Sequence, residues 1–161
     1  MKLEFSAGGV VFKNNDFGPD FAMASPGKQS KDNIFILVSQ HSQHHGWVFP
    51  KGFIGDKEEF KGQTKEETAL REVQEETGVI GKILEPLTPV TYWYEMDQVK
   101  RRKTVYYYVM QEMGGDITQH DWEMEKVEWL PMDQVEDRLT YDSDKKVWEE
   151  AREKIEKIVK S

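Results

Sequence analysis

The chain has 161 residues, which is enough for one domain with a sizeable core, and its net charge of −8 argues against broad charge-driven binding to nucleic acid or membrane. The lack of cysteine excludes disulfides and thiolate metal sites. No apolar run approaches the roughly 18 residues that span a bilayer, and the first residues are not typical of a signal peptide, so we expect a cytoplasmic protein.

The first third of the chain predicts two strands and a long loop. Residues 3–12 (LEFSAGGVVF) favour a first strand, and the apolar run 34–39 (IFILVS) is typical of a buried one. The segment 14–33, which mixes Gly, Pro, Ser, Asn and Asp, predicts a loop that we expect to be partly mobile. It could serve as a lid, as a dimer contact or as a passive linker. After the polar turn HSQHHG, residues 47–52 (WVFPKG) favour a short strand.

The clearest predicted helix follows Thr64. Thr64 and Glu67 have the spacing of a capping box, and Gly78 favours a left-handed C-cap. Between them, the apolar positions that would face the core are Ala69, Leu70 and Val73.

The second half of the chain predicts shorter elements. Residues 83–95 and 103–112 favour two strands, with the basic run KRRK (100–103) in the link between them. A short strand is predicted over 127–131 (VEWLP), a short helix over 132–139 and a final helix over 143–160. The irregular alternation favours the α/β class, with a mixed sheet covered by helices, in a single domain spanning 1–161.

Three carboxylates crowd the end of the helix that begins after Thr64. Glu72, Glu75 and Glu76 are spaced i, i+3 and i, i+4, so they can converge at one edge of the helix. Like charges at these spacings destabilise a helix by a few tenths of a kcal/mol each. A solvated surface would explain an isolated pair, but here a Gly-containing loop leads into a well-capped helix. Hard oxygen ligands in this arrangement suit Mg²⁺.

The stretch REVQEETGV, with the preceding WVFPKG, resembles the signature of the Nudix hydrolases, G-x5-E-x7-R-E-U-x-E-E-x-G-U, where U is a bulky aliphatic residue. Every position of its second half is filled, by Arg71, Glu72, Val73, Glu75, Glu76, Gly78 and Val79. SAGGVVF and VEWLP also resemble strands of this family, so the likeness extends over most of the chain. It implies a Nudix-type α/β/α sandwich with a mixed sheet.

This chain departs from the first half of the signature. Counting back from Arg71, the signature expects Glu and Gly where the chain has Gln63 and Lys57. Counting forward from Gly52 places Arg71 five residues late. We therefore interpret residues 55–62 as containing a five-residue insertion and Gly52 as the motif glycine. Gln63 could keep the hydrogen bond of the family's first Glu but not its charge.

The resemblance implies that a phosphoanhydride in a nucleoside-diphosphate-linked substrate is hydrolysed with Mg²⁺, or Mn²⁺ as a substitute. Such cations would neutralise phosphate oxygens and lower the pKa of a bound water. The implied metal ligands are Glu72, Glu75, Glu76 and the backbone carbonyl of Lys51 or Gly52. Arg71 would hold a motif carboxylate in position, although a surface pair with Glu75 explains it equally well.

Many members of this family supply one more acidic residue from the loop before the late strand. The candidates here are Glu123 and Glu125. We favour Glu123, which lies six residues before Trp129, as a metal ligand or the general base.

Substrate contacts are predicted from charge and aromaticity. Lys51, beside the motif glycine, resembles the diadenosine polyphosphate and diphosphoinositol polyphosphate branches and could contact phosphate as a point charge. The basic run 100–103 could hold distal phosphates, or be a solvated hairpin turn. One or two aromatic residues beside it could stack on a base. The candidates are Arg101, Arg102, Lys103, Tyr92, Tyr94 and Tyr106. The histidines of the HSQHHG turn are explained equally well as turn residues.

The expected function is hydrolysis of dinucleoside polyphosphates such as diadenosine polyphosphates. One alternative is clean-up of modified nucleoside triphosphates, and another is a catalytically silent domain that binds nucleotide, RNA or protein. The intact second half of the signature argues against the silent domain. The leading hypothesis expects a nucleotide as partner, without a membrane or a nucleic acid, and the sequence does not determine the oligomeric state.

Overall fold

The computed structural model of this protein describes residues 1–14, 33–55 and 58–160. The loop predicted over 14–33 therefore lies, apart from its two end residues, outside the described residues.

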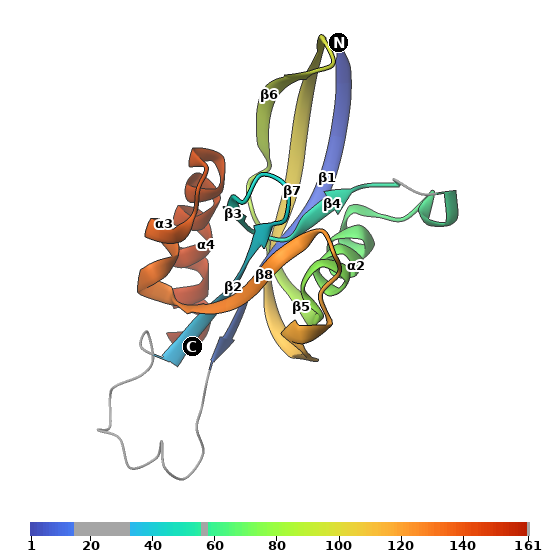
Figure 1. Cartoon of the computed structure of the whole chain (residues 1–161). Helices are drawn as coiled ribbons and strands as arrows, with labels where there is room; N and C mark the ends of the chain where they lie inside the picture. Colours follow the sequence, from blue (N-terminus) through green and yellow to red (C-terminus); the bar gives the residue numbers. More distant parts are fainter. Residues whose placement is uncertain (15–32, 56–57, 161) are drawn as a thin grey trace, which may run out of the picture.

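The described chain alternates strands with few helices (Figure 1). The strands are β1 (Lys2–Asn14), β2 (Ile34–His41), β3 (Trp47–Val48), β4 (Lys51–Phe53), β5 (Val79–Pro86), β6 (Val90–Met96), β7 (Val99–Gly115) and β8 (Met124–Pro131). The α-helices are α2 (Lys65–Thr77), α3 (Val135–Arg138) and α4 (Asp142–Lys160). Short 3₁₀ segments are η2 (Glu58–Phe60), η3 (Ile117–Gln119) and η4 (Met132–Gln134). None of the helices in these ranges is long and apolar enough to cross a membrane.

One mixed sheet forms the middle layer. Its main order is β3-β2-β1-β7-β5, with β4 on β1, β6 on β7 and β8 on β2. Strands β1 and β7 run parallel, and the other pairs in the described chain are antiparallel. Helix α2 covers one face and helices α3 and α4 lie on the other (Figure 1). The predicted mixed α/β fold is thereby confirmed.

Strand β1 contributes to both cores of the sandwich. Val10 and Phe12 pack in the cluster that contains Trp148 of α4. Ala7 and Val11 pack in the cluster that contains Val73 of α2. Successive side chains of a strand point to opposite faces, so an apolar run such as GGVVF can fill both layers.

The segment predicted as one strand over 83–95 is two strands. Strand β5 ends at Pro86 and β6 begins at Val90, with Pro89 between them. Because proline has no amide hydrogen, two prolines in four residues interrupt the ladder. Leu87 nevertheless stays attached to the sheet, since its amide donates to the carbonyl of Tyr107 at 2.9 Å.

The basic run 100–103 lies inside β7 and not in a link, which corrects the sequence prediction. The turn is Asp97–Gln98, and both residues have positive φ, 52° and 63°. Such a two-residue turn matches the right-handed twist of a hairpin, although the sequence lacks its usual glycine. The short helix predicted over 132–139 is the 3₁₀ turn η4 followed by the single turn of α3.

The caps predicted for α2 are confirmed. Thr64 Oγ1 accepts a hydrogen bond from the Glu67 amide, and the Glu67 carboxylate accepts one from the Thr64 amide, each at 3.0 Å. Gly78 has φ of 81°, and its amide donates to the carbonyl of Gln74 at 2.8 Å. A Cβ at Gly78 would lie 2.0 Å from the carbonyl oxygen of Asp116, so this position excludes any side chain.

Substituting Gly78 by alanine should destabilise the protein far more than substituting Gly62. Both glycines have positive φ, but nothing lies within 4 Å of a Cβ at Gly62. Gly62→Ala should lose about 1 kcal/mol from backbone strain alone, and Gly78→Ala about 3 kcal/mol or more. Urea unfolding of both variants measures the difference, and equal losses would contradict the steric role of Gly78.

Candidate active site

The three glutamates of α2 differ in exposure. Glu72 and Glu76, one helical turn apart, are 6% and 5% exposed, whereas the Glu75 side chain is 38% exposed. The predicted cluster is therefore two buried carboxylates with a third at the rim. Burying ionised carboxylates is costly unless charges or hydrogen bonds compensate.

Arg71 links these acids to the preceding loop. Its Nη1 donates to Glu72 at 2.9 Å and to both carboxylate oxygens of Glu75 at 3.2 Å. Its Nε donates to the side-chain oxygen of Gln63 at 3.0 Å, so the hydrogen bond predicted for Gln63 is confirmed. The guanidinium lies 3.7 Å from the centre of the Phe60 ring. Sequence reasoning missed Phe60, which lies in the segment interpreted as an insertion.

Gly52 allows β4 to approach Glu72. A Cβ at Gly52 would lie 2.0 Å from the carboxylate carbon of Glu72. Beside it, the Lys51 amide donates to Glu76 at 3.1 Å. Gly8 of β1 is equally necessary, because a Cβ there would lie 2.1 Å from the Pro50 carbonyl oxygen. These two close backbone contacts hold residues 50–52 (PKG) against the buried acids.

The electrostatics of Glu76 involve Lys51 and two carboxylates, Glu72 and Glu123. Burial raises the pKa of Glu76 well above its usual value. The Lys51 ammonium and the Lys51 amide hydrogen bond lower it, and the carboxylates of Glu72 and Glu123 raise it further. The carboxylates of α2 and the turn before β8 are therefore close enough to repel one another.

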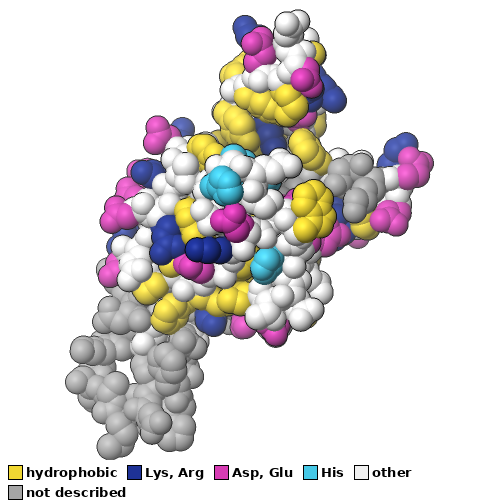
Figure 2. Space-filling view, viewed as in Figure 1, with side chains coloured by type: hydrophobic (Ala, Val, Ile, Leu, Met, Phe, Trp, Pro, Cys, Tyr) yellow, Lys and Arg dark blue, Asp and Glu magenta, His cyan; other side chains and the backbone are white. Residues whose placement is uncertain are grey.

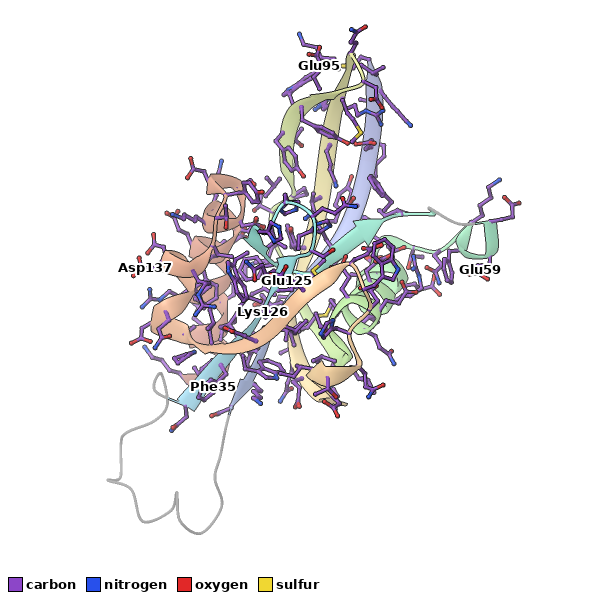
Figure 3. The ribbon with its side chains drawn as sticks, viewed as in Figure 1. Phe35, Glu59, Glu95, Glu125, Lys126 and Asp137 are labelled. Carbon is purple, nitrogen blue, oxygen red and sulfur yellow. The ribbon has the colours of Figure 1, made fainter. Side chains whose placement is uncertain are left out.

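The turn that carries Glu123 is held at both ends. The Asp121 amide donates to the Glu75 carbonyl at 3.1 Å, and the Asp121 carboxylate accepts from the Glu123 amide at 3.1 Å. The Glu123 carbonyl accepts from the Ser42 amide at 2.9 Å. The other candidate, Glu125, lies on β8 (Figure 3) and pairs with the exposed His45 at 3.2 Å.

The predicted substrate contacts on β6 and β7 lie on two opposite faces of one part of the sheet, which we call the arm. We define the arm as residues 1–5, 90–96 and 99–105, where the start of β1 pairs with β7 and β7 pairs with β6. Its outer part extends beyond the helical layers (Figure 1), whereas Val90, Tyr92 and Val105 still pack in the core on the α4 side. Directly opposed residues of a ladder share a face, and the ladder opposes Tyr92 to Lys103, Tyr94 to Arg101 and Trp93 to Arg102.

One face of the arm therefore carries Arg101, Lys103, Tyr92 and Tyr94. The opposite face carries Arg102, whose guanidinium lies 5.9 Å from the Trp93 ring centre. It also carries Tyr106, whose ring lies 4.6 Å from the ammonium of Lys65 on α2. The predicted contacts do not form one surface.

Lys103 is an arm cation that is electrostatically coupled to Glu76. Burial lowers its pKa to about 8, as does the nearby Lys51 ammonium, whereas Glu4 and Glu76 act in the opposite direction. Its ammonium lies 4.6 Å from the centre of the Phe53 ring, another residue that sequence reasoning missed.

Arg101 is neutralised within the arm. Its guanidinium donates to Glu4 at 3.1 Å, and Glu4 also accepts a hydrogen bond from the hydroxyl of Tyr94. Besides Arg71, which donates to Glu72, the cations coupled to the buried acids are Lys51 and Lys103.

The histidines of the β2–β3 turn have a structural explanation. The rings of His41 and His44 stack with centres 4.2 Å apart. Their Nδ1 atoms accept backbone amides of the same turn, from Gln43 at 3.1 Å and Gly46 at 3.0 Å. These bonds suffice to explain a polar turn.

The donor chemistry fits a hard divalent cation. Carboxylate oxygens on two buried and two partly exposed acids are the ligands that Mg²⁺ prefers, and positive charge would relieve their mutual repulsion. In the part of the chain that the structure describes, no three acidic or histidine side chains form a finished cation site, and Arg71 holds Glu72 and Glu75.

The fold of this chain is that of a Nudix domain. The NUDIX domain of Shewanella oneidensis NrtR, solved with ADP-ribose, superposes with a TM-score of 0.66 at 22% identity, covering 96% of this chain and 90% of that one. The sequence profile of the NUDIX domain family matches residues 23–151. The chain belongs to this family.

Three similar proteins carry different names, two of which state a substrate. A Mycobacterium tuberculosis protein named as a mutator protein, MutT4, is 36% identical over 155 residues, covering 96% of this chain and 57% of its own length. The 8-oxo-(d)GTP phosphatase of Mycolicibacterium smegmatis is 34% identical over 117 residues (71% and 32%). The asymmetrical bis(5′-nucleosyl)-tetraphosphatase of Rattus norvegicus is 32% identical over 104 residues (63% and 66%). The chain thus spans about half of the first relative and a third of the second.

Replacing Glu76 by Gln should stabilise the metal-free protein. A carboxyl whose pKa is higher in the folded state than in the unfolded state destabilises the fold once the pH exceeds its pKa in the unfolded chain. The full loss is about 1.4 kcal/mol per unit of pKa difference. The gain from Glu76→Gln should be absent below the pKa of the unfolded chain and grow as pH rises toward the folded value. Gln can still accept the Lys51 amide. Urea unfolding in EDTA at about pH 4 and pH 7 measures this, and a variant less stable than the wild type at pH 7 would contradict it.

Proposed function

We propose that this chain hydrolyses a phosphoanhydride in a nucleoside-diphosphate-linked substrate, with Mg²⁺ or Mn²⁺ bound at the acids of α2. The observation that supports this best is the close approach of the Lys51–Gly52 backbone to two buried carboxylates, Glu72 and Glu76. A binding module without chemistry would gain nothing from burying carboxylates that repel one another. Membership of the NUDIX domain family agrees with this activity.

The residues of the chain divide the work. Glu72, Glu75, Glu76 and the carbonyl of Lys51 or Gly52 would hold the cation, which when bound supplies positive charge to phosphate oxygens and acidifies a water. Arg71, braced by its stacking on Phe60, fixes the orientation of the Glu72 carboxylate. A carboxylate whose rotamer is already fixed loses less conformational entropy when it binds a ligand.

Glu123 is the proposed proton acceptor. It is half-buried, so it can reach both the other acids and the solvent, whereas Glu72 and Glu76 are enclosed. Its backbone is fixed through Asp121 and Ser42, which keeps the carboxylate in place during turnover. A base must be within reach of the water and able to release the proton afterwards.

For the substrate we propose a dinucleoside polyphosphate, such as a diadenosine polyphosphate. Lys51 and Lys103 carry positive charge from the acids toward the arm, which suits a phosphate chain longer than a diphosphate. Tyr92, Tyr94 and Phe53 offer aromatic surface on the same face as Lys103 for a base. The name of the Rattus norvegicus relative supports this substrate class.

Modified nucleoside triphosphates are the second candidate. The name of the Mycolicibacterium smegmatis relative supports it, and the phosphates of either substrate would meet the same acids and Lys51. The two candidates differ beyond the phosphates: the first needs a second nucleoside or distal phosphate at Lys103, and the second does not.

A product assay separates the candidates. The protein is incubated with Mg²⁺ and, separately, with diadenosine tetra-, penta- and hexaphosphate, canonical triphosphates, 8-oxo-dGTP and ADP-ribose. We expect ATP from the dinucleotides, with turnover reduced by about two orders of magnitude or more in Glu76→Gln and abolished by EDTA. Turnover confined to 8-oxo-dGTP, with release of its monophosphate, would favour the second candidate. Tight nucleotide binding without any turnover would exclude both.

The pH dependence of kcat/KM should report Lys103. Its pKa of about 8 means that the ammonium is charged at pH 7 and mostly neutral at pH 9. The affinity for a polyphosphate should fall as pH rises through this value, by roughly tenfold relative to Lys103→Arg, whose guanidinium remains charged. Dividing the wild-type profile by that of Lys103→Arg cancels the pH dependence of the remaining groups. A constant ratio would show that Lys103 does not contact phosphate.

A further inference from the structure

The outer edge of the arm is uncovered in the described chain. Strand β1 pairs with β7 from Lys2 to Phe12 on one side. On its other side, β4 pairs with Ser6–Gly8 and β2 with Phe12–Asn14. β4 turns away from the arm (Figure 1), so Lys2–Phe5 form a free strand edge, touched by one hydrogen bond at its end. Free edges are templates for pairing with another strand.

Two contacts show which residues direct their backbone toward this edge. The Phe5 carbonyl accepts from the Ile54 amide at 2.9 Å, and the Gly9 amide donates to the Pro50 carbonyl at 3.1 Å. Backbone groups alternate sides along a strand, and the β1–β7 register is continuous. Odd-numbered residues therefore face the free side, and Leu3 directs both its amide and its carbonyl there.

Apolar side chains gather on the same arm. Leu3 is 52% and Phe5 45% exposed, on one face of β1. The arm carries most of the large exposed apolar residues in the described chain, namely Met1, Leu3, Phe5, Trp93, Met96 and Val99. Figure 2 shows such side chains between charged ones on the arm. An apolar surface next to a free edge is typical of an interface.

We propose that two copies of this chain pair antiparallel along this edge, around a two-fold axis at Leu3. Leu3 and the partner's Leu3 would exchange both backbone hydrogen bonds. Met1 would oppose the partner's Phe5 on the apolar face, and Lys2 would oppose the partner's Glu4 on the other face. By symmetry each contact occurs twice, and the arms of the two copies join in one continuous sheet.

Charge complementarity selects this register over its neighbours. Because only odd-numbered residues direct their backbone groups to the free edge, odd residues must oppose odd residues. The neighbouring registers therefore have their two-fold axis at Lys2 or at Glu4. An axis at Lys2 would place Lys2 opposite itself, and an axis at Glu4 would place Glu4 opposite itself. Like charges directly opposed destabilise a ladder, and opposite charges stabilise it by roughly 0.2–1 kcal/mol per pair. The axis at Leu3 is the register that opposes Lys2 to a carboxylate, that of Glu4, which within its own arm also accepts from Arg101 and Tyr94.

Cysteine cross-linking tests this register, because the chain contains no cysteine of its own. Hydrogen-bonded antiparallel pairs place Cα atoms about 5.5 Å apart, within the range that a disulfide spans. Leu3→Cys should therefore form a covalent dimer under mild oxidation, at least tenfold faster than Phe5→Cys. The two Phe5 positions lie about 14 Å apart along the proposed ladder. Met113→Cys, 58% exposed and outside the arm, gives the rate of random collision.

Sedimentation equilibrium gives a second measurement that needs no cysteine. The wild-type mass should rise with concentration from 18.9 kDa toward twice that value. Leu3→Asp should remain at the single-chain mass, whereas the matched surface control Met113→Asp should dimerise like the wild type. A wild type that stays monomeric to about 1 mM, or equal cross-linking at positions 3 and 5, would overturn the proposal. Neither experiment depends on hydrolysis, so its outcome is separate from that of the proposed function.

Discussion

The candidate site depends on the contact between the backbone of β4 and the buried glutamates of α2. Gly52 leaves no room for a side chain against Glu72, and the adjacent amide of Lys51 donates to Glu76. The approach requires Gly8, because any side chain there would collide with the Pro50 carbonyl. Two glycines in different strands thus let a neutral backbone solvate acids that burial would otherwise leave without partners.

Those contacts compensate only part of the negative charge of the site. Glu76 accepts a backbone amide, and Arg71 is shared between Glu72 and Glu75, so one guanidinium serves two carboxylates. The raised pKa of Glu76 is the sign of this deficit. A divalent cation would supply the missing charge, which would give the family's use of divalent metals a physical reason in this chain's own residues. The uncompensated carboxylates lower the stability of the metal-free protein, and the charge of a bound ligand would restore it.

Local signals in the sequence were enough to predict α2, its two caps and the mixed α/β class. Gln63 was expected to be able to keep the hydrogen bond of the family's first Glu, and it accepts one from Arg71. Phe60 and Phe53 could not be predicted, because their contacts with Arg71 and Lys103 join segments whose distance depends on the insertion and on the arm. The basic run 100–103 was placed in the link between two strands, as a phosphate contact or a solvated turn, because charge density along a sequence does not reveal where a strand begins.

The alternation of side chains along each strand gives the arm two separate surfaces. Lys103 shares one face with Glu4, Arg101 and the two tyrosines, where burial lowers its pKa toward neutrality. Leu3 and Phe5 lie on the other face, where apolar surface adjoins an open edge. A ladder formed at that edge would order the start of β1 and hence Glu4, which holds Arg101 and Tyr94. Pairing on one surface would therefore stiffen the residues that frame the other, because both are carried by the same few residues of one strand.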